Sequence, residues 1–142
     1  MADNITAFLK LIRWCEHYPH EPSDADYKTM FGNGKLDNLK DHPRKTATRW
    51  GYTSSAAGAY QITVATYDEF KKKLGLKDFS AESQDKIATA IIKQAGALDL
   101  INEGQIEAAI KKLTRRWSSL PGGSQSQVTM SDALKKYESY QK

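Results

Sequence analysis

After Gln61 the apolar residues of this chain recur at the spacing of a helix in segment after segment. Such spacing places side chains on one face of an α-helix, where they can pack against a core. Gly75 and Gly96 follow two of these stripes and are expected to end their helices. A final helix is expected to begin at Ser131 or Asp132 and to run through Tyr140. The stripes consist of Tyr67, Phe70 and Leu74; of Ile87, Ile91 and Ile92; and of Ile106, Ala109, Ile110 and Leu113.

A further helix is predicted near the start of the chain. Thr6 is an acceptable N-cap, and the following residues alternate on a helical period. Pro19 makes continuation far beyond Glu16 or His17 unfavourable, because proline lacks the amide hydrogen that a helix interior needs. The helix is therefore expected to end at one of these two residues.

The region from residue 26 to residue 61 has a different character. The Gly-Asn-Gly turn at 32–34 separates DYKTMF from KLDNL and predicts a short β-hairpin. Residues 46–52 are rich in threonine and aromatic residues and indicate another strand. We therefore expect an α+β fold, a single mostly helical domain over residues 1–142. A small β-hairpin lobe after the first helix would form a substrate cleft with the helical lobe.

Glu16 is an unusual residue for the helical face on which it lies. It shares that face with Leu9 and Ile12, so its carboxyl group is expected to be half-buried. It also lies in the last turn, where the helix dipole disfavours negative charge. Both effects raise the pKa of a carboxylic acid toward neutrality, where it can act as a general acid. Solvated glutamates at helix ends are common, so the pattern alone leaves that alternative open.

The composition is that of a globular protein. Of the 142 residues, 39% are hydrophobic and 27% are charged, and no apolar run approaches the ~18 residues of a membrane span. The first residues lack the continuous apolar core of a signal peptide. The net charge of +4 favours polyanions, either nucleic acid or an anionic cell-wall polymer. The basic residues are scattered, however, as on solvated helix faces.

Cys15 is the only cysteine, so no intramolecular disulfide can form. It shares its side of the first helix with Phe8 and Leu11, which favours a small buried thiol over a nucleophile. Nothing else in the sequence resembles a cysteine-protease or metal framework. Neither a metal nor a cofactor is expected.

Six blocks of the sequence together resemble the lambda-phage endolysin family. They occur in the family's order with similar spacing and span almost the whole chain. Members of that family are lysozyme-like lytic transglycosylases, which cleave the β-1,4 bond between N-acetylmuramic acid and N-acetylglucosamine in peptidoglycan. The resemblance therefore implies a lysozyme-like fold and a bacteriolytic enzyme. The blocks are AFLKLIRWCEHYP at 7–19, DHPRK at 41–45, SSAAGAYQI at 54–62, LGLKDFSAESQD at 74–85, GAL at 96–98 and SLPG at 119–122.

The resemblance also implies site residues. The family's catalytic acid ends a Trp-Ser-Glu sequence at the end of the first helix, and here Glu16 takes that position. The tyrosine–glutamine element of the family's sugar groove corresponds to Tyr60, expected to stack on or hydrogen-bond a sugar, and Gln61, expected to hold an N-acetyl group. Structural roles for both are the alternative. The other substrate-binding candidates are Gly58, Ser55, Asp41 and His42, the last two in a loop at the lip of the groove.

A lone carboxylate suffices for the implied reaction. In a transglycosylase the C6 hydroxyl of muramic acid attacks its own C1, and an intramolecular nucleophile has a high effective molarity. A hydrolytic muramidase and a non-catalytic wall-binding protein remain alternatives, and a nucleic-acid-binding protein ranks last. No other carboxylate of the lobe stands in a recognisable nucleophile setting; those considered are Glu21, Asp24, Asp26, Asp37 and Asp41.

The resemblance finally implies partners and a place of action. The expected partner is the glycan strand of peptidoglycan, with no nucleic acid and no stable membrane association, and the protein is expected to be a monomer. Without a signal peptide it would accumulate in the host cytoplasm. It would then act in the periplasm after a holin opens the inner membrane.

Overall fold

The computed structural model describes residues 3–142, which form six α-helices, one 3-10 helix and four short strands. Their contacts divide the chain into two compact units. One, the helical unit, combines the chain up to Pro22 with Ala88–Lys142; the other, the hairpin unit, is Ser23–Ile87. The expectation of one domain over residues 1–142 stays a prediction.

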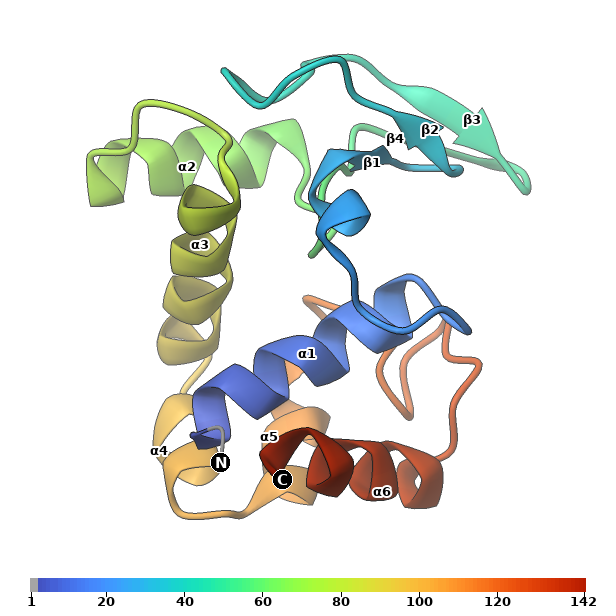
Figure 1. Cartoon of the computed structure of the whole chain (residues 1–142), viewed down its shortest axis with the longest axis vertical. Coiled ribbons are helices and arrows are strands. Elements are labelled where there is room, and N and C mark those ends of the chain that lie inside the picture. Colours follow the sequence, from blue (N-terminus) through green and yellow to red (C-terminus); the bar gives the residue numbers. More distant parts are fainter. Residues whose placement is uncertain (1–2) are drawn as a thin grey trace. The chain divides into compact units, whose positions relative to one another are not determined.

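The helical unit is built around α1 (Asn4–Glu16), which packs along α6 (Met130–Gln141) and against α4 (Leu98–Asn102) (Figure 1). The short helix α5 (Ile106–Leu113) packs on α4 and α6, and the unit also includes the end of α3 (Ala81–Gln94). The apolar face of α1 is fully buried at Phe8, Leu11 and Ile12. Phe8 meets Tyr137 of α6 edge to face, with 6.4 Å between ring centroids.

The helix starts differ from the prediction. α1 is capped by Asp3, whose carboxylate accepts from the amide of Thr6 at 2.8 Å, so Thr6 lies inside the first turn. The prediction of Thr6 as N-cap was wrong because an aspartate three residues earlier satisfies the free amide. The last helix is capped by Thr129, not by Ser131 or Asp132, through a 3.1 Å bond from the Asp132 amide. The five-residue helix α4 has no stripe and was not predicted.

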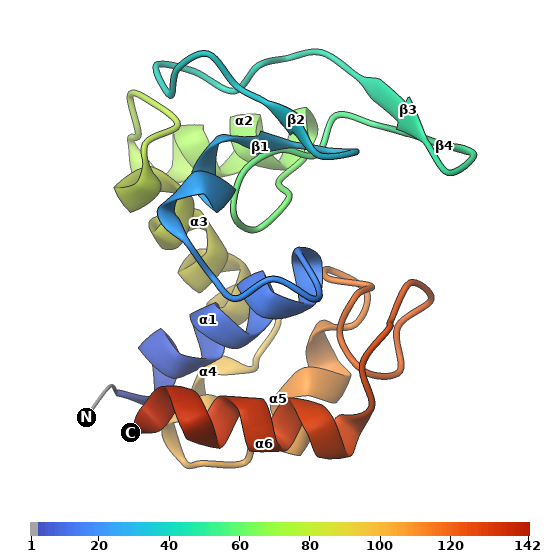
Figure 2. The same ribbon diagram turned by 45° about the vertical axis from the view of Figure 1, so that its right-hand side comes forward.

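The hairpin unit contains two separate antiparallel pairs of strands. β1 (Thr29–Met30) and β2 (Gly34–Lys35) pair around a turn at 31–33, so the first hairpin is confirmed, with the last residue of the predicted turn already in β2. The strand expected within 46–52 is β3 (Ala47–Arg49), and it pairs with β4 (Tyr52–Ser54) (Figure 2). The 3-10 helix η1 (Asp24–Lys28) precedes β1, and α2 (Val64–Leu74) follows β4, ending at the left-handed Gly75 as expected.

The core of the hairpin unit joins an aromatic cluster to one buried amide. The rings of His42, Tyr67 and Phe79 contact one another, with centroids 5.1–5.6 Å apart. Gln84 of α3 has no exposed surface, yet its side chain is fully bonded. Its oxygen accepts from the amide of Ala59 at 2.9 Å, and its nitrogen donates to the carbonyls of Tyr27 and Phe79. This amide ties η1, the 56–62 loop and α3 together.

Within residues 3–142 no helix is both long and apolar enough to cross a membrane.

Candidate active site

Glu16 is the last residue of α1, and its side chain is partly buried. It stands there because the apolar stripe of the helix, which includes the fully buried Ile12, continues to its C-terminal turn. Ser119 donates its hydroxyl hydrogen to Oε2 of Glu16 across 2.5 Å. A short bond of this kind fixes the position of the carboxyl group and stabilises its ionised form.

The proton affinity of Glu16 is strongly perturbed. Burial raises the pKa of its carboxyl group from 4.5 to about 7, and the hydrogen bond from Ser119 opposes this rise. Near neutral pH the protonated and ionised forms are therefore both well populated. A group of this kind can donate a proton and later take one back, as general acid–base catalysis requires.

The loop after α5 presents Ser119 to this carboxyl group. Trp117 and Leu120 are buried and anchor it, and the amide of Leu120 donates to the carbonyl of Trp117 at 3.1 Å. Gly123 is needed where the loop folds back, since a Cβ there would lie 2.2 Å from the carbonyl oxygen of Ser118. The SLPG block marks this loop in the sequence, but it carries no signal that Ser119 points at Glu16, and this partner was missed.

The two residues beside Glu16 make packing and capping contacts. Cys15 is 4% exposed, and burial together with the charge of Glu16 raises the pKa of its thiol to about 12. The prediction of a buried thiol is therefore confirmed. With so high a pKa the nucleophilic thiolate is not populated at neutral pH. His17 caps α1 through its backbone, donating its amide hydrogen to the carbonyl of Arg13 at 3.0 Å.

Tyr60 is almost completely buried in this structure. The side chain is 1% exposed, and its hydroxyl donates to Oδ1 of Asp85 at 2.6 Å. Tyr27 donates to the same oxygen at 2.9 Å. This burial and these bonds fit a structural role for Tyr60, the alternative that the sequence left open. Its contact with a sugar, by stacking or by a hydrogen bond, stays a prediction.

Gly58 and Gln61 shape the same loop. Gly58 has φ +87°, and a Cβ there would lie 2.2 Å from Oε1 of Gln84. Gln61 also has a positive φ, 49°, and its side-chain nitrogen donates to the carbonyls of Gly58 at 2.8 Å and Thr29 at 3.2 Å. The close approach made possible by Gly58 is thus to Gln84. The role of Gln61 toward an N-acetyl group stays a prediction.

The remaining candidates hold elements of the hairpin unit in place. His42 is buried, with Nε2 2.8 Å from the carbonyl oxygen of Ile62, and Nδ1 accepts from the amide of Arg44. Burial lowers the pKa of His42. Asp41 is exposed and paired with Arg44, whose hydrogen bond lowers the pKa of the carboxyl group. Ser55 accepts from the amide of Val64 at the start of α2. Substrate contacts for these residues stay predictions.

The other carboxylates considered in the sequence differ from Glu16 in their contacts or their exposure. Glu21 pairs with Lys136 and accepts from the hydroxyl of Tyr140. Asp26 is buried and accepts from the amide of Ser23, closing the N-terminus of η1. Asp24 and Asp37 are exposed. Within the described part of the chain no group of three or more histidine, cysteine, aspartate or glutamate side chains is arranged to hold a metal ion.

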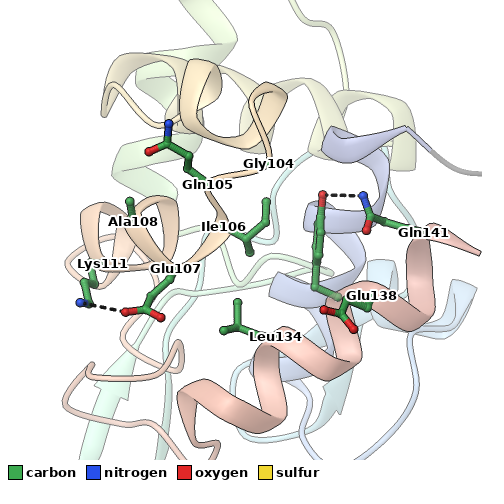
Figure 3. A pocket seen from close by; sticks show the side chains of 10 residues that line it. Gly104, Gln105, Ile106, Glu107, Ala108, Lys111, Leu134, Glu138 and Gln141 are labelled. Carbon is green, nitrogen blue, oxygen red and sulfur yellow. Dashed lines mark hydrogen bonds and ion pairs between the residues drawn. The ribbon is translucent and has the colours of Figure 1, made fainter.

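A hollow of about 600 Å³ opens between the α4–α5 turn, α5 and α6 (Figure 3). Its lining combines apolar side chains, such as Ile106 and Leu134, with polar ones, such as Gln105 and Glu138. None of the predicted site residues lines it. The hollow is therefore separate from the predicted site residues, Glu16 among them.

The fold is lysozyme-like. A solved structure of bacteriophage lambda lysozyme complexed with a chitohexasaccharide matches with a TM-score of 0.88 and 33% identity, covering 99% of this chain and 96% of that one. Another lysozyme structure from bacteriophage lambda matches with a TM-score of 0.85 and 31% identity, covering 99% and 95% of the two chains.

The sequence comparisons give the family. A family model described as endolysin matches residues 6–141, so the chain belongs to the endolysin family. The endolysin of Escherichia phage lambda is 38% identical over 125 residues, 85% of this chain and 79% of that protein. The endolysin of Escherichia phage P2 is 34% identical over 137 residues, covering 87% and 83%. The resemblance read from the sequence blocks is confirmed.

Proposed function

We propose that this peptidoglycan-degrading endolysin is a lytic transglycosylase, with Glu16 as its only catalytic carboxyl group. The observation that carries the proposal is the pKa of about 7 for Glu16, raised by burial and moderated by the hydroxyl of Ser119. A glycosidase with two carboxyl groups places them about 5–9.5 Å apart. None of the other carboxylates considered from the sequence stands in a recognisable nucleophile setting, and a transglycosylase needs no second one.

The proposed reaction needs one proton carrier and no water. Protonated Glu16 donates its proton to the bridging oxygen as the bond from C1 of N-acetylmuramic acid to that oxygen breaks. The released chain leaves with a free 4-hydroxyl on N-acetylglucosamine. The C6 hydroxyl of the muramic acid then bonds to C1, and its proton passes to the ionised Glu16. The acid is thereby restored, and the muramic acid ends as a 1,6-anhydro sugar.

Ser119 acts through Glu16 in this mechanism. Its hydrogen bond holds the carboxyl group in one orientation and favours the ionised form that must accept the second proton. Burial favours the protonated form that must donate the first. The balance between these two effects places the pKa of Glu16 where both steps proceed near neutral pH.

Two properties support a glycan polymer as substrate. The lambda lysozyme to which this chain is similar was solved with a chitohexasaccharide, an oligomer of the amino sugar found in peptidoglycan. The net charge of +4 favours approach to an anionic wall. We further propose that the enzyme acts as a monomer in the periplasm, after release from the host cytoplasm through a holin.

The test is analysis of the products. Purified sacculi are digested with the wild type, and the soluble fragments are analysed by mass spectrometry. Fragments ending in 1,6-anhydromuramic acid are expected, 18 mass units lighter than the hydrolysis product because no water is added, as intramolecular attack requires. Reducing muramic ends would instead establish a hydrolytic muramidase.

Glu16→Gln is the matched variant for this test. The amide has nearly the same shape but cannot donate the proton, so the digestion rate is expected to fall by about 10³-fold or more. Binding to sacculi should persist in this variant. A wild type that binds sacculi without releasing fragments would identify a wall-binding protein and overturn the proposal.

A further inference from the structure

Trp50 is exposed in a way that the other tryptophans of this chain are not. Trp14 and Trp117 are 9% and 3% exposed, whereas Trp50 is 66% exposed at the tip of the β3–β4 hairpin. Tyr52, two residues later, is 57% exposed. Figures 1 and 2 show this hairpin reaching beyond β1 and β2 within the hairpin unit. Two large aromatic side chains are thus held in water at one turn.

The turn that carries Trp50 has an unfavourable backbone conformation. The pair Arg49 and Tyr52 closes the hairpin, so Trp50 and Gly51 are its two central residues, with φ of +52° and +79°. Such a turn needs positive φ at both positions, which glycine, asparagine and aspartate adopt most readily. Tryptophan at the first position is unfavourable both for the backbone and for solvation. A bulky residue held in a rare conformation is a reason to look for a ligand.

The exposed ring is held in place by its neighbours. Phe31, from the β1–β2 turn, meets Trp50 edge to face with 5.8 Å between centroids. The guanidinium carbon of Arg49 lies 5.4 Å from the centre of the Trp50 ring. The aliphatic part of the Arg49 side chain packs on Gly32. A Cβ added to Gly32 would lie 2.3 Å from Cγ of Arg49. The two hairpin turns therefore form one preorganised surface, the aromatic platform of Phe31, Arg49, Trp50 and Tyr52.

The stretch of chain that contains β3 and β4 carries only positive charges. No aspartate or glutamate occurs between Asp41 and Asp68, while Lys45 and Arg49 lie in this stretch. Arg49 is directly opposite Tyr52 across the strands, so both side chains lie on the same face of the hairpin. An aromatic face beside a guanidinium suits a ligand that combines a flat apolar surface with an anionic group.

We propose that the aromatic platform is a binding site for the glycan strand of peptidoglycan. A pyranose ring would stack its C–H face on the indole of Trp50, and Arg49 would pair with a carboxylate of the muramic acid or of the peptide stem. This inference rests on the proposed function, because it takes the same polymer as the ligand. The platform would add a contact to the strand besides the one at Glu16.

The experiment measures binding apart from catalysis. Glu16→Gln is made in every protein, and co-sedimentation with insoluble purified sacculi gives the apparent affinity. Adding Trp50→Asn is expected to weaken binding about tenfold, the loss typical of an aromatic anchor. The thermal midpoint of the same variant is expected to stay equal or to rise, since asparagine accepts the positive φ of this position. Weaker binding without lower stability separates a ligand contact from a structural one.

Leu74→Ser is the matched control. Leu74 is another exposed apolar residue of the hairpin unit, 41% exposed at the end of α2, and it lies outside the platform. Its replacement is expected to leave sacculus binding unchanged. Equal affinity of the Trp50→Asn protein and its parent would overturn the platform while leaving the proposed function intact.

Two further outcomes of the experiment can be told apart from loss of the platform contact. If the Glu16→Gln parent does not sediment with sacculi at all, the proposed glycan substrate fails, and the platform proposal fails with it. The same proteins are also mixed with phosphatidylglycerol vesicles. Vesicle binding that depends on Trp50, without any effect of Trp50 on sacculus binding, would assign the platform to a membrane surface and overturn the proposal.

Discussion

Ser119 and Glu16 are 103 residues apart in the chain, and their side chains are joined by a 2.5 Å hydrogen bond. The bond links the C-terminal turn of α1 to the loop after α5, both in the helical unit. Burial raises the pKa of Glu16, and the hydrogen bond from Ser119 lowers it. Without the bond the pKa would be higher still. The acidity of Glu16 therefore depends on a loop that comes late in the sequence.

Replacing Ser119 with alanine should make Glu16 a weaker acid. Without the hydroxyl that favours the ionised form, the pKa of Glu16 rises above about 7, and the alkaline limb of the rate–pH profile moves to higher pH. The maximal rate should fall by about tenfold, because the carboxyl group loses its fixed orientation. The measurement is the rate of sacculus clearing between pH 5 and 9.

Ser118→Ala is the control for that change. Ser118 precedes Ser119 in the same loop, but its hydroxyl lies 3.2 Å from Oε1 of Gln125 and not at Glu16. The variant should keep the wild-type rate profile. An identical profile for Ser119→Ala would show that the hydroxyl does not tune the acid.

The raised pKa of Glu16 should also be visible in the stability of the protein. Its folded pKa of about 7 lies above the ordinary value of 4.5. The native state therefore holds this proton more tightly, and the contribution is fully present below pH 4.5 and is lost as the pH rises through 7. The loss attributable to this group is at most about 3 kcal/mol. Urea unfolding of the wild type and of Glu16→Gln at pH 5 and pH 8 measures it.

The glutamine variant has no titrating group at this position, so the comparison isolates Glu16. The variant should gain stability relative to the wild type on going from pH 5 to pH 8, and the gain equals the part of the Glu16 contribution that is lost between these two pH values. Equal pH dependence of the two proteins would mean that the carboxyl group titrates near its ordinary pKa in the fold.

The sequence predicted elements better than it predicted contacts. Helical stripes and the turn at 32–34 are local patterns, and the helices and the first hairpin follow them. Glu16 was placed at the end of α1 from the same local pattern. The short helix α4 was missed because five residues do not establish a periodicity.

Polar partners between distant segments were beyond such reasoning. The residue that faces Glu16 is set by how the loop near Ser119 folds, and a serine in sequence does not reveal the direction of its hydroxyl. The bond from the hydroxyl of Tyr60 to Asp85 was missed for the same reason; the sugar contact that its sequence block suggested stays a prediction. Bonds of this kind depend on tertiary packing, which no local period encodes.

Gly58→Ala should destabilise the hairpin unit. Alanine at φ +87° is strained, and its Cβ would collide with the buried amide of Gln84, only 2.2 Å away. That amide bonds three backbone groups, so its displacement leaves buried donors and acceptors unpaired. A loss of about 2–4 kcal/mol in the free energy of unfolding is expected. Urea unfolding measures it, and a loss below about 1 kcal/mol would contradict the tight packing.

Gly123→Ala should damage activity more than stability. A Cβ at this position would lie 2.2 Å from the backbone oxygen of Ser118, and a backbone atom cannot swing aside as the end of a side chain can. The loop must therefore shift, and with it the bond from Ser119 to Glu16. We expect the rate of sacculus clearing to fall about tenfold and its alkaline limb to rise, as in Ser119→Ala. Gly104→Ala is the control: its φ of +80° is unfavourable for alanine, but no atom lies within 4 Å of the added Cβ. That variant should lose about 1 kcal/mol of stability and keep the wild-type pH profile. A wild-type profile for Gly123→Ala as well would show that the loop accommodates the methyl group without moving Ser119.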